Sequence, residues 1–312
     1  MNELELIARL TRLLPTNPSV VAGAGDDCAI LDLGIPERWV LFKTDAVVEG
    51  VHFAGEAPPE KIGHKALGRA LSDIAAMAGT PTAAVISLGL PTGFDPDRVE
   101  KIYLGLGALA RRHDVAIVGG EVTENPGGVW ISVSLIGTVQ RGRAVLRSGA
   151  KVGDAIFVTG TLGGSLAGRH LEFEPRLNEA RWLAGNFSVH AMIDLSDGLA
   201  SDLQHLLNAG SVGAEVLKSS IPISRDAKKR FRDGSSTRPP FAAAMLDGED
   251  FELMFVVPTR EAVRLVDAWK AQFPDLALAC IGKVTAGSGI TIRDRLGSKP
   301  FTAHGYVHFA QS

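Results

Sequence analysis

The sequence predicts an α+β fold made of two domains, each containing a sheet with helices on one side. With 312 residues the chain is long enough for two ordinary domains, and a hydrophobic content of 46% is enough to build their cores. Apolar strands and helices follow one another without the regular β-α-β-α-β order of a doubly wound sheet. The stretch from Arg141 to Val152 is polar and has no clear period. We therefore expect one domain at residues 1–148 and a second at residues 149–312.

Apolar spacing predicts the elements of the first domain. An amphipathic helix is expected at residues 3–14, ending before Pro15. Two further helices are expected at residues 60–79 and 97–113, and Gly79 ends the first of them. Strands are expected at residues 28–31, 39–45, 83–90, 115–118 and 129–139.

The second domain is assigned fewer elements. Strands are expected at residues 155–159, 191–194 and 251–256, with a helix at residues 199–207. The glycine turn from Gly160 to Ser165 is expected to open a helix, with a phosphate-binding nest as the alternative. Residues 232–240 are expected to form a flexible surface segment.

Composition excludes several classes of protein. The net charge of −3 and the lack of a Lys/Arg cluster argue against nucleic-acid binding. No apolar run approaches the ~20 residues of a membrane span. The first residues also lack a signal-peptide layout, so we expect a soluble, cytoplasmic protein. Cys28 and Cys280 are both flanked by apolar residues and are expected to be reduced core thiols, not a disulfide or a zinc site.

Acidic residues at the ends of apolar elements are the strongest functional signal. Asp26 and Asp27 stand between a glycine loop and a strand, and their side chains point in opposite directions on an extended backbone, so both cannot chelate one ion. Asp73 lies at the edge of the buried face of an alanine-rich helix, where a carboxylate needs a cationic or hydrogen-bonding partner. The full set of such acids is Asp26, Asp27, Asp45, Asp73, Glu121, Asp194, Asp197, Glu249 and Asp250.

Convergence of even three of these acids would require a cation. Two unit negative charges ~4 Å apart repel by about 4 kcal/mol at an effective dielectric constant of about 20. Carboxylate and hydroxyl oxygens suit Mg²⁺, which typically works beside substrate phosphates. The sequence has no His/Cys cluster for zinc, no Walker A loop, no reliable Rossmann fingerprint and no protein-kinase signature. If the chain handles ATP, it does so with several Mg²⁺ ions on a less common scaffold.

Seven short motifs follow one another along the chain. They are Gly25-Asp26-Asp27, Thr44-Asp45 with Glu49-Gly50-Val51-His52-Phe53, Leu71-Ser72-Asp73-Ile74-Ala75-Ala76-Met77, Gly119-Gly120-Glu121, Arg147-Ser148-Gly149-Ala150, Ile193-Asp194-Leu195-Ser196-Asp197-Gly198-Leu199 and Gly248-Glu249-Asp250-Phe251-Glu252-Leu253. Read together, they resemble the thiamine-monophosphate kinases of the aminoimidazole-ribotide-synthetase-like superfamily. The resemblance runs from the first helix to Gly305–Phe309, which is practically the whole chain.

This resemblance implies a PurM-like fold. Its N-terminal mixed sheet would form a homodimer and bind ATP and Mg²⁺, and its α/β-layered C-terminal domain would complete the phosphate and substrate site. The implied reaction moves the γ-phosphoryl group of ATP directly and in line to the phosphate of thiamine monophosphate, without a phosphoenzyme. Such a transfer depends on positioning and countercharge, so no acid–base residue is assigned.

The resemblance also assigns residues to three groups by motif. Mg²⁺ ligands would be Asp27, Thr44, Asp45, Asp73, Glu121, Asp194 and Asp197. ATP contacts would be Tyr103, Gly120, Arg147 and Ser196. The thiamine phosphate pocket would be lined by His52, Glu249 and Tyr306.

Several of these residues have an ordinary structural alternative. His52 could be a packed or solvated histidine, and Arg147 could form a salt bridge at the domain boundary. Either Asp194 or Asp197 could cap the helix that follows them. Glu249, with Asp250, could form a turn.

Two positions depart from the family pattern. Glu121 and Val122 stand where Asp-Thr is usual, and the longer side chain moves the carboxylate by ~1.5 Å. Because Mg²⁺ demands near-ideal octahedral geometry, this shift predicts an effect on metal occupancy or rate. Lys43 stands where a small hydroxyl residue is common, and it either replaces part of a cation's charge or points outward.

Two other functions stay open at this point. The chain could be a sister enzyme such as selenophosphate synthetase or the hydrogenase-maturation dehydratase. The absence of cysteine from residues 1–22 and from the Phe309–Ser312 end counts against both. A non-catalytic protein that binds nucleotide or thiamine phosphates is the third possibility, and Glu121 and Lys43 are its support.

Overall fold

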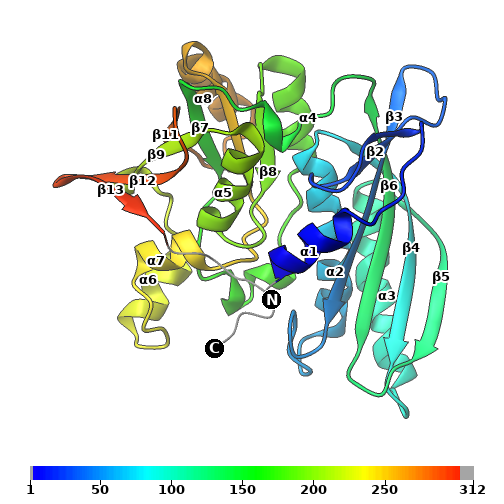
Figure 1. Cartoon of the computed structure of the whole chain (residues 1–312). Helices are drawn as coiled ribbons and strands as arrows, with labels where there is room; N and C mark the ends of the chain where they lie inside the picture. The colour runs from blue at the N-terminus through cyan, green and yellow to red at the C-terminus, as the bar shows by residue number, and fades with distance from the viewer. Residues whose placement is uncertain (1–2, 303–312) are drawn as a thin grey trace. The chain divides into compact units, whose positions relative to one another are not determined.

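The computed structural model describes residues 3–302, which form two compact units (Figure 1). Residues 19–144 and 168–181 form one of them, which we call the N-terminal unit, and the other described residues form the C-terminal unit. A single boundary at residue 148 would put residues 3–18 in the first domain and residues 168–181 in the second. In the structure, residues 3–18 belong to the C-terminal unit and residues 168–181 to the N-terminal unit. The assignment of separate functions to residues 1–148 and 149–312 stays a prediction.

The N-terminal unit contains a six-stranded mixed sheet, as expected. Its strand order is β1-β2-β3-β6-β4-β5, in which β4 and β5 are parallel and the other neighbours are antiparallel. The strands are β1 (Val20–Ala22), β2 (Ala29–Leu31), β3 (Arg38–Val48), β4 (Thr80–Leu90), β5 (Ala116–Glu124) and β6 (Trp130–Gln140).

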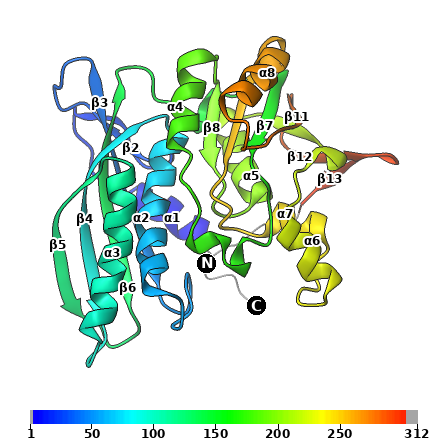
Figure 2. The same cartoon turned by 180° about the vertical axis from the view of Figure 1, so that it is seen from behind.

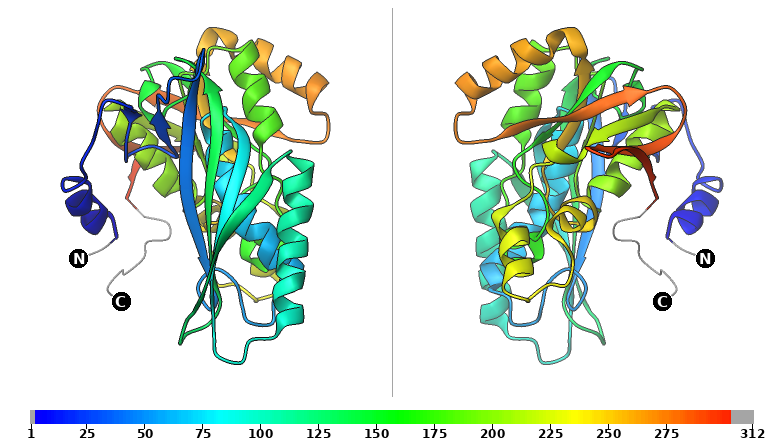
Figure 3. Two further views of the ribbon diagram at one scale, coloured as in Figure 1. Left: turned by 90° about the vertical axis from the view of Figure 1, so that its right-hand side faces the viewer. Right: turned by 90° about the vertical axis from the view of Figure 1, so that its left-hand side faces the viewer.

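Helices α2 (Pro59–Ala76) and α3 (Pro96–Arg112) cover one face of this sheet (Figure 2). They approach each other closely because glycines stand at the crossing: a Cβ on Gly63 would lie 1.9 Å from the Ile102 carbonyl oxygen, and one on Gly105 equally close to that of Glu60. Most of α2 is buried, including nearly all of its last three turns. The side views of Figure 3 show the long strands running beside α3.

The C-terminal unit contains a seven-stranded sheet with the order β13-β12-β9-β11-β7-β10-β8, in which only the pair β9 and β12 is parallel among the described strands. One hydrophobic core lies between this sheet and α5, with Ile156, Leu203, Leu206 and Val256 fully buried in it. The strands are β7 (Asp154–Thr159), β8 (Ala191–Asp194), β9 (Gly213–Leu217), β10 (Leu253–Pro258), β11 (Leu278–Thr285), β12 (Gly289–Asp294) and β13 (Gly297–Phe301). The α-helices are α1 (Glu3–Thr11), α5 (Leu199–Gly210), α6 (Arg225–Arg232), α7 (Pro240–Leu246) and α8 (Ala262–Gln272), while α4 (Leu177–Asn186) contains the boundary between the units.

The elements expected from the sequence are present, with two differences. No α-helix follows the Gly160 turn; a short 3-10 turn at Ser165–Ala167 stands there instead. The sequence analysis also assigned nothing to β1, α4, β9, α6, α7, α8 or β11–β13.

The two cysteines differ from each other. Both thiols are free, and Cys28 is buried as expected. Cys280 is exposed, so its assignment to the core is wrong. That expectation relied on the apolar residues that flank Cys280, but the register of β11 shifts between Cys280 and Gly282, so apolar neighbours in the sequence do not decide which side of the strand the thiol occupies. Within residues 3–302, no helix has both the length and the apolar character needed to cross a membrane.

Candidate functional site

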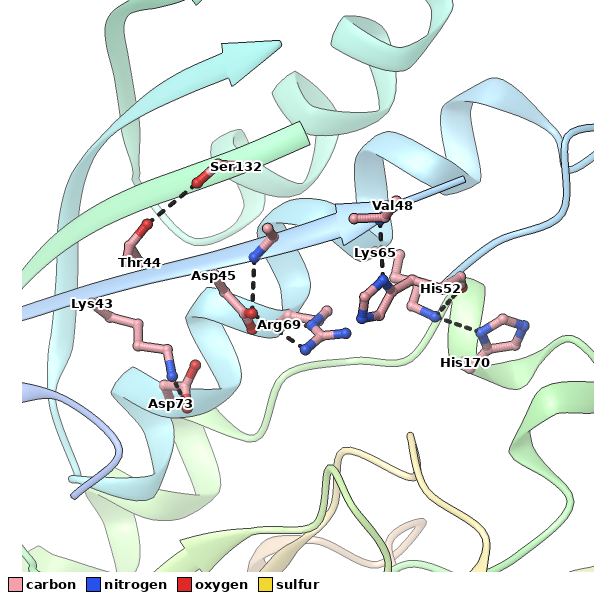
Figure 4. A network of polar contacts seen from close by, with 11 residues as sticks. Lys43, Thr44, Asp45, Val48, His52, Lys65, Arg69, Asp73, Ser132 and His170 are labelled. Carbon is pink, nitrogen blue, oxygen red and sulfur yellow. Dashed lines mark hydrogen bonds and ion pairs between the residues drawn. The ribbon is translucent and has the colours of Figure 1, made fainter. Parts of the chain in front are cut away.

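In the N-terminal unit, β3 presents its candidate ligands on two opposite faces. Lys43 and Asp45 point toward α2, in the same row as fully buried Leu41 and Val47. Thr44 points to the other face, where its hydroxyl lies 3.3 Å from Ser132 Oγ (Figure 4). The structure therefore does not bring Thr44 together with Asp45, because adjacent side chains on a strand alternate.

Each acid on the helix side of β3 and α2 meets a cation. Lys43 Nζ lies 3.0 Å from Asp73 Oδ1, so Lys43 does not point outward. Arg69 donates to both carboxylate oxygens of Asp45, at 3.0 and 3.2 Å (Figure 4). Burial by itself would raise the pKa of Asp45, but the charges of Arg69 and Lys43 outweigh it and hold the pKa below its ordinary value. Lys43, likewise, has a raised pKa because the charges of Asp73 and Asp45 outweigh its burial.

Asp27 and Asp73 form a buried pair of acids. A carboxylate oxygen of each lies within 4.8 Å of one on the other. Between the flanking loop and β2, burial raises the pKa of the Cys28 thiol, and the charges of Asp73 and Asp27 raise it further. Asp26 braces the loop, because its carboxylate accepts a hydrogen bond of 3.0 Å from the Asp27 amide. The donors of the pair are oxygens, which fits a hard cation such as Mg²⁺, and Lys43 supplies countercharge beside them.

His52 occupies a tight turn after β3. Its Nδ1 accepts a hydrogen bond of 3.1 Å from the Val48 amide, so the proton of the neutral ring lies on Nε2. Its carbonyl oxygen accepts from the ammonium group of Lys65, which is fully buried. His52 is therefore held in place, and the simple alternative of a solvated histidine does not describe it.

The other candidates of the N-terminal unit lie apart from the acid pair. Gly120 is required by the backbone, because a Cβ there would lie 1.7 Å from the Ile86 carbonyl oxygen. Glu121 on β5 lies opposite Ser87 on β4, and Ser87 lies opposite Ser132 on β6. Residues that lie opposite each other share a face of the sheet, so the Glu121 side chain is on the face of Thr44 and not on that of Asp45. Tyr103 is 36% exposed on α3, outside the buried residues that pack α3 against α2.

In the C-terminal unit, two of the predicted motifs lie side by side. The Glu249 amide donates to the Ser196 carbonyl oxygen at 2.7 Å, and the Phe251 amide donates to that of Leu195 at 2.8 Å. Glu249 and Phe251 both have positive φ values, of 63° and 50°, which non-glycine residues adopt at a cost. Strain of this kind is frequent at functional sites, and here the two backbone hydrogen bonds hold the strained Glu249 turn against the Ser196 loop.

Three acids gather at the same place. Asp194 ends β8, Asp197 follows in the loop, and the Asp197 amide donates to Asp202 Oδ2 at 3.1 Å. Burial raises the pKa of Asp202 well above its ordinary value, and the charges of Asp197 and Asp194 raise it further. The charge of Arg147 opposes this shift in the pKa of Asp202, and residues 147–149 contact both α5 and β8. Asp202 was missed by the sequence analysis, although its position four residues into an apolar helix was a usable signal.

The glycine turn at residues 160–165 is not a vacant anion nest. The Gly163 amide donates to both Asp250 oxygens, at 3.1 and 2.9 Å, and the Gly164 amide donates to Asp247 at 3.0 Å. The protein's own carboxylates thus occupy the amides that a phosphate would need. Asp250 is accordingly a turn former, as the structural alternative had it, and Tyr306 lies outside the described residues.

Both halves of the chain match known families. The model for the N-terminal domain of AIR synthase related protein matches residues 25–139, and the model for its C-terminal domain matches residues 151–295. The thiamine-monophosphate kinase of Rhodopirellula baltica is 38% identical over 301 residues, covering 93% of this chain and 92% of that protein. The thiamine-monophosphate kinase of Salmonella typhimurium is 36% identical over 99% of this chain and 98% of its own length.

A solved structure agrees with these relatives. The structure described as AaThiL complexed with AMPPCP and TMP has a TM-score of 0.84, is 30% identical, and covers 99% of this chain and 97% of that one. The similarity confirms the PurM-like α+β fold and extends over the whole described chain. This protein therefore belongs to the thiamine-monophosphate kinases, a family of phosphotransferase enzymes within the AIR synthase related proteins.

Proposed function

We propose that this protein transfers the γ-phosphoryl group of ATP to thiamine monophosphate, producing thiamine diphosphate and ADP. The names of its relatives and the two ligands of the AaThiL complex, AMPPCP and TMP, support this proposal. The observation that carries it is the buried pair Asp27 and Asp73, whose oxygens lie within 4.8 Å of each other. Buried carboxylates repel at such a distance, and a site that gathers them is suited to the cations that accompany phosphates.

Several Mg²⁺ ions belong to the proposal. When bound, Mg²⁺ would neutralise charge on the phosphates that meet at the site. In the N-terminal unit Asp27 and Asp73 would hold it, with Asp45 close by; in the C-terminal unit Asp194 and Asp197 would do so. Lys43 and Arg69 add positive charge that the resemblance did not assign, at 3.0 Å from Asp73 and Asp45 respectively.

Direct in-line transfer needs positioning more than it needs acid–base chemistry. The tautomer of His52 leaves its N–H on Nε2, which suits donation to the phosphate of thiamine monophosphate. Ser196 and Glu249, joined through their backbones, would contact ATP and thiamine monophosphate respectively. Gly120, Tyr103 and Arg147 remain proposed ATP contacts, and a cytoplasmic location remains a prediction from composition.

A homodimer is the second part of the proposal. One face of the N-terminal sheet is without a helix of its own unit, and it exposes Phe42, Val85 and Ile136 by 40–46%. At the edge, β5 exposes Val118 and Val122 by more than half. An edge strand of this kind pairs readily with another chain, so a second copy is the expected occupant. Thr44 and Glu121 lie on that face, where they would meet the partner and not Asp45.

The decisive experiment follows thiamine diphosphate by chromatography while a coupled assay measures ADP. The protein is incubated with ATP, thiamine monophosphate and Mg²⁺, and a reaction without thiamine monophosphate is the control. Equal amounts of both products support the proposal. Binding of an ATP analogue without product would instead establish the non-catalytic function. The Lys43–Asp73 ion pair favours that function, because the ammonium group of Lys43 neutralises a carboxylate that is proposed to bind Mg²⁺.

A further inference from the structure

Helix α2 presents a polar stripe on an otherwise buried surface. Lys65, Arg69 and Asp73 stand four residues apart, so they lie one above the other on the same face. Arg69 and Asp73 meet Asp45 and Lys43 of β3 (Figure 4). Lys65 has a different set of partners and takes no part in the metal chemistry proposed above.

The ammonium group of Lys65 joins two segments that are far apart in the sequence. It donates to the carbonyl oxygen of His52 and lies 2.8 Å from Nδ1 of His170 (Figure 4). Because an ammonium group only donates, Nδ1 of His170 must accept, and the ring carries its proton on Nε2. Lys65 is fully buried and His170 is 8% exposed, so these hydrogen bonds are shielded from water. Burying an ammonium group is costly unless such partners are fixed in place.

Short-range hydrogen bonds shape the turn that ends at His52. The His52 amide donates to the Val48 carbonyl oxygen at 2.8 Å, and the Gly50 amide donates to that of Phe53 at 2.8 Å. The Val48 amide orients the imidazole through Nδ1. Lys65 adds a contact of longer range, because it ties this turn to α2 through the carbonyl oxygen of His52 itself.

His170 is held at its place independently of Lys65. Residues 168–174, which we call the clasp segment, lie along α2 in the N-terminal unit although they follow the first C-terminal strand. His64 Nε2 lies 2.7 Å from the Phe173 carbonyl oxygen, and the Phe173 ring packs so closely on Gly68 that a Cβ there would come within 2.9 Å. Lys61 also forms an ion pair of 2.7 Å with Glu172, but both side chains are exposed, so this pair adds little to the anchoring by Phe173. The clasp segment therefore gives Lys65 a fixed acceptor.

We propose that Lys65, braced by His170, is a positioning residue that sets the His52 turn for thiamine monophosphate. This inference rests on the proposed function, in which His52 faces the substrate phosphate. Without the ammonium group the His52 carbonyl oxygen loses its donor and the turn can relax, which moves the imidazole. The ATP contacts lie on other elements, so the effect is selective for one of the two substrates.

The test replaces Lys65 with Met in the full-length protein, which keeps the length of the side chain and removes its donors. We expect the KM for thiamine monophosphate to rise about 10-fold, the size of effect that is common when a group that orients a binding side chain is removed. The KM for ATP should change less than about 2-fold. Lys61→Met is the matched control: the same substitution one turn earlier on α2, also facing the clasp segment, which we expect to behave as wild type. Equilibrium binding of each ligand by calorimetry gives the same comparison without turnover.

A second variant covers the case in which Lys65→Met does not fold. His170→Leu removes the acceptor and should reproduce the selective loss, whereas His170→Gln keeps an acceptor oxygen and should restore most of the affinity. If the variants fold and weaken both substrates equally, or lower only the melting temperature, the positioning role is wrong. If wild-type protein forms no thiamine diphosphate, the proposed function fails instead. The inference is then judged by ¹⁵N NMR of the imidazoles: an unchanged His52 signal in Lys65→Met overturns it, and a shifted signal supports it.

Discussion

Replacing Lys43 with Met tests how the buried acids of the N-terminal unit are compensated. At the 3.0 Å that separates Lys43 Nζ from Asp73, attraction is about 5.5 kcal/mol at an effective dielectric constant of about 20. At the 4.8 Å limit for Asp27 and Asp73, repulsion is about 3.5 kcal/mol on the same scale. Desolvation of the ions opposes the attraction, and breaking a buried pair costs ~3–5 kcal/mol. Because the Lys43 side chain is 25% exposed, we expect the lower end, about 3 kcal/mol.

Urea unfolding in the presence of EDTA measures this loss. The variants Lys43→Met, Asp73→Asn and the double substitution form a cycle, which separates the ion pair from the other effects of each change. Most of the loss should disappear in the double variant, because no uncompensated carboxylate then remains at position 73. Millimolar Mg²⁺ should also restore part of the stability of Lys43→Met, since an ion that binds the native state alone stabilises it.

The control for this cycle is Lys61→Met, which breaks an exposed ion pair with Glu172 and should cost less than about 1 kcal/mol. A loss of the same small size for Lys43→Met would refute the reasoning, because it would show that Asp73 needs no cation. So would an equal loss in the single and double variants, since the pair would then contribute nothing through Asp73.

Three further predictions address activity, metal geometry and pH. Asp73→Asn should leave the protein folded and reduce kcat by at least about 10²-fold; a near-normal rate would remove Asp73 from the metal site. Glu121→Asp should keep or raise kcat at saturating Mg²⁺, and a large loss would show that the site has adapted to glutamate. Burial lowers the pKa of His64, and this effect outweighs the hydrogen bond with the Phe173 carbonyl oxygen, which favours the charged form of the ring. Its contribution to stability is therefore complete above the ordinary histidine pKa of about 6.5 and is lost as the pH falls below that value toward the folded pKa. Urea midpoints measured between about pH 5 and 7.5 should fall less steeply on the acid side in His64→Gln than in wild type, and parallel curves would contradict the assignment.

Features that depend on local spacing could be predicted from the sequence. Apolar periodicity indicated α2, α3 and the long strands, because a helix or strand repeats its buried face every few residues. The acid-bearing turns next to Gly25, Gly120 and Gly198 could also be predicted, because each adjoins an apolar run in the sequence. The in-order motifs then identified the family, which the comparisons confirmed.

Which side chains meet could be learned only from the folded chain. Lys43 could not be assigned to Asp73, nor Arg69 to Asp45, because each pair joins a strand and a helix whose register comes from packing. The alternation along β3 separated Thr44 from Asp45, and the clasp segment brought His170 to Lys65 from more than 100 residues away. Buried charges select partners by distance in space, and a one-dimensional pattern carries that distance only within one helix or one strand.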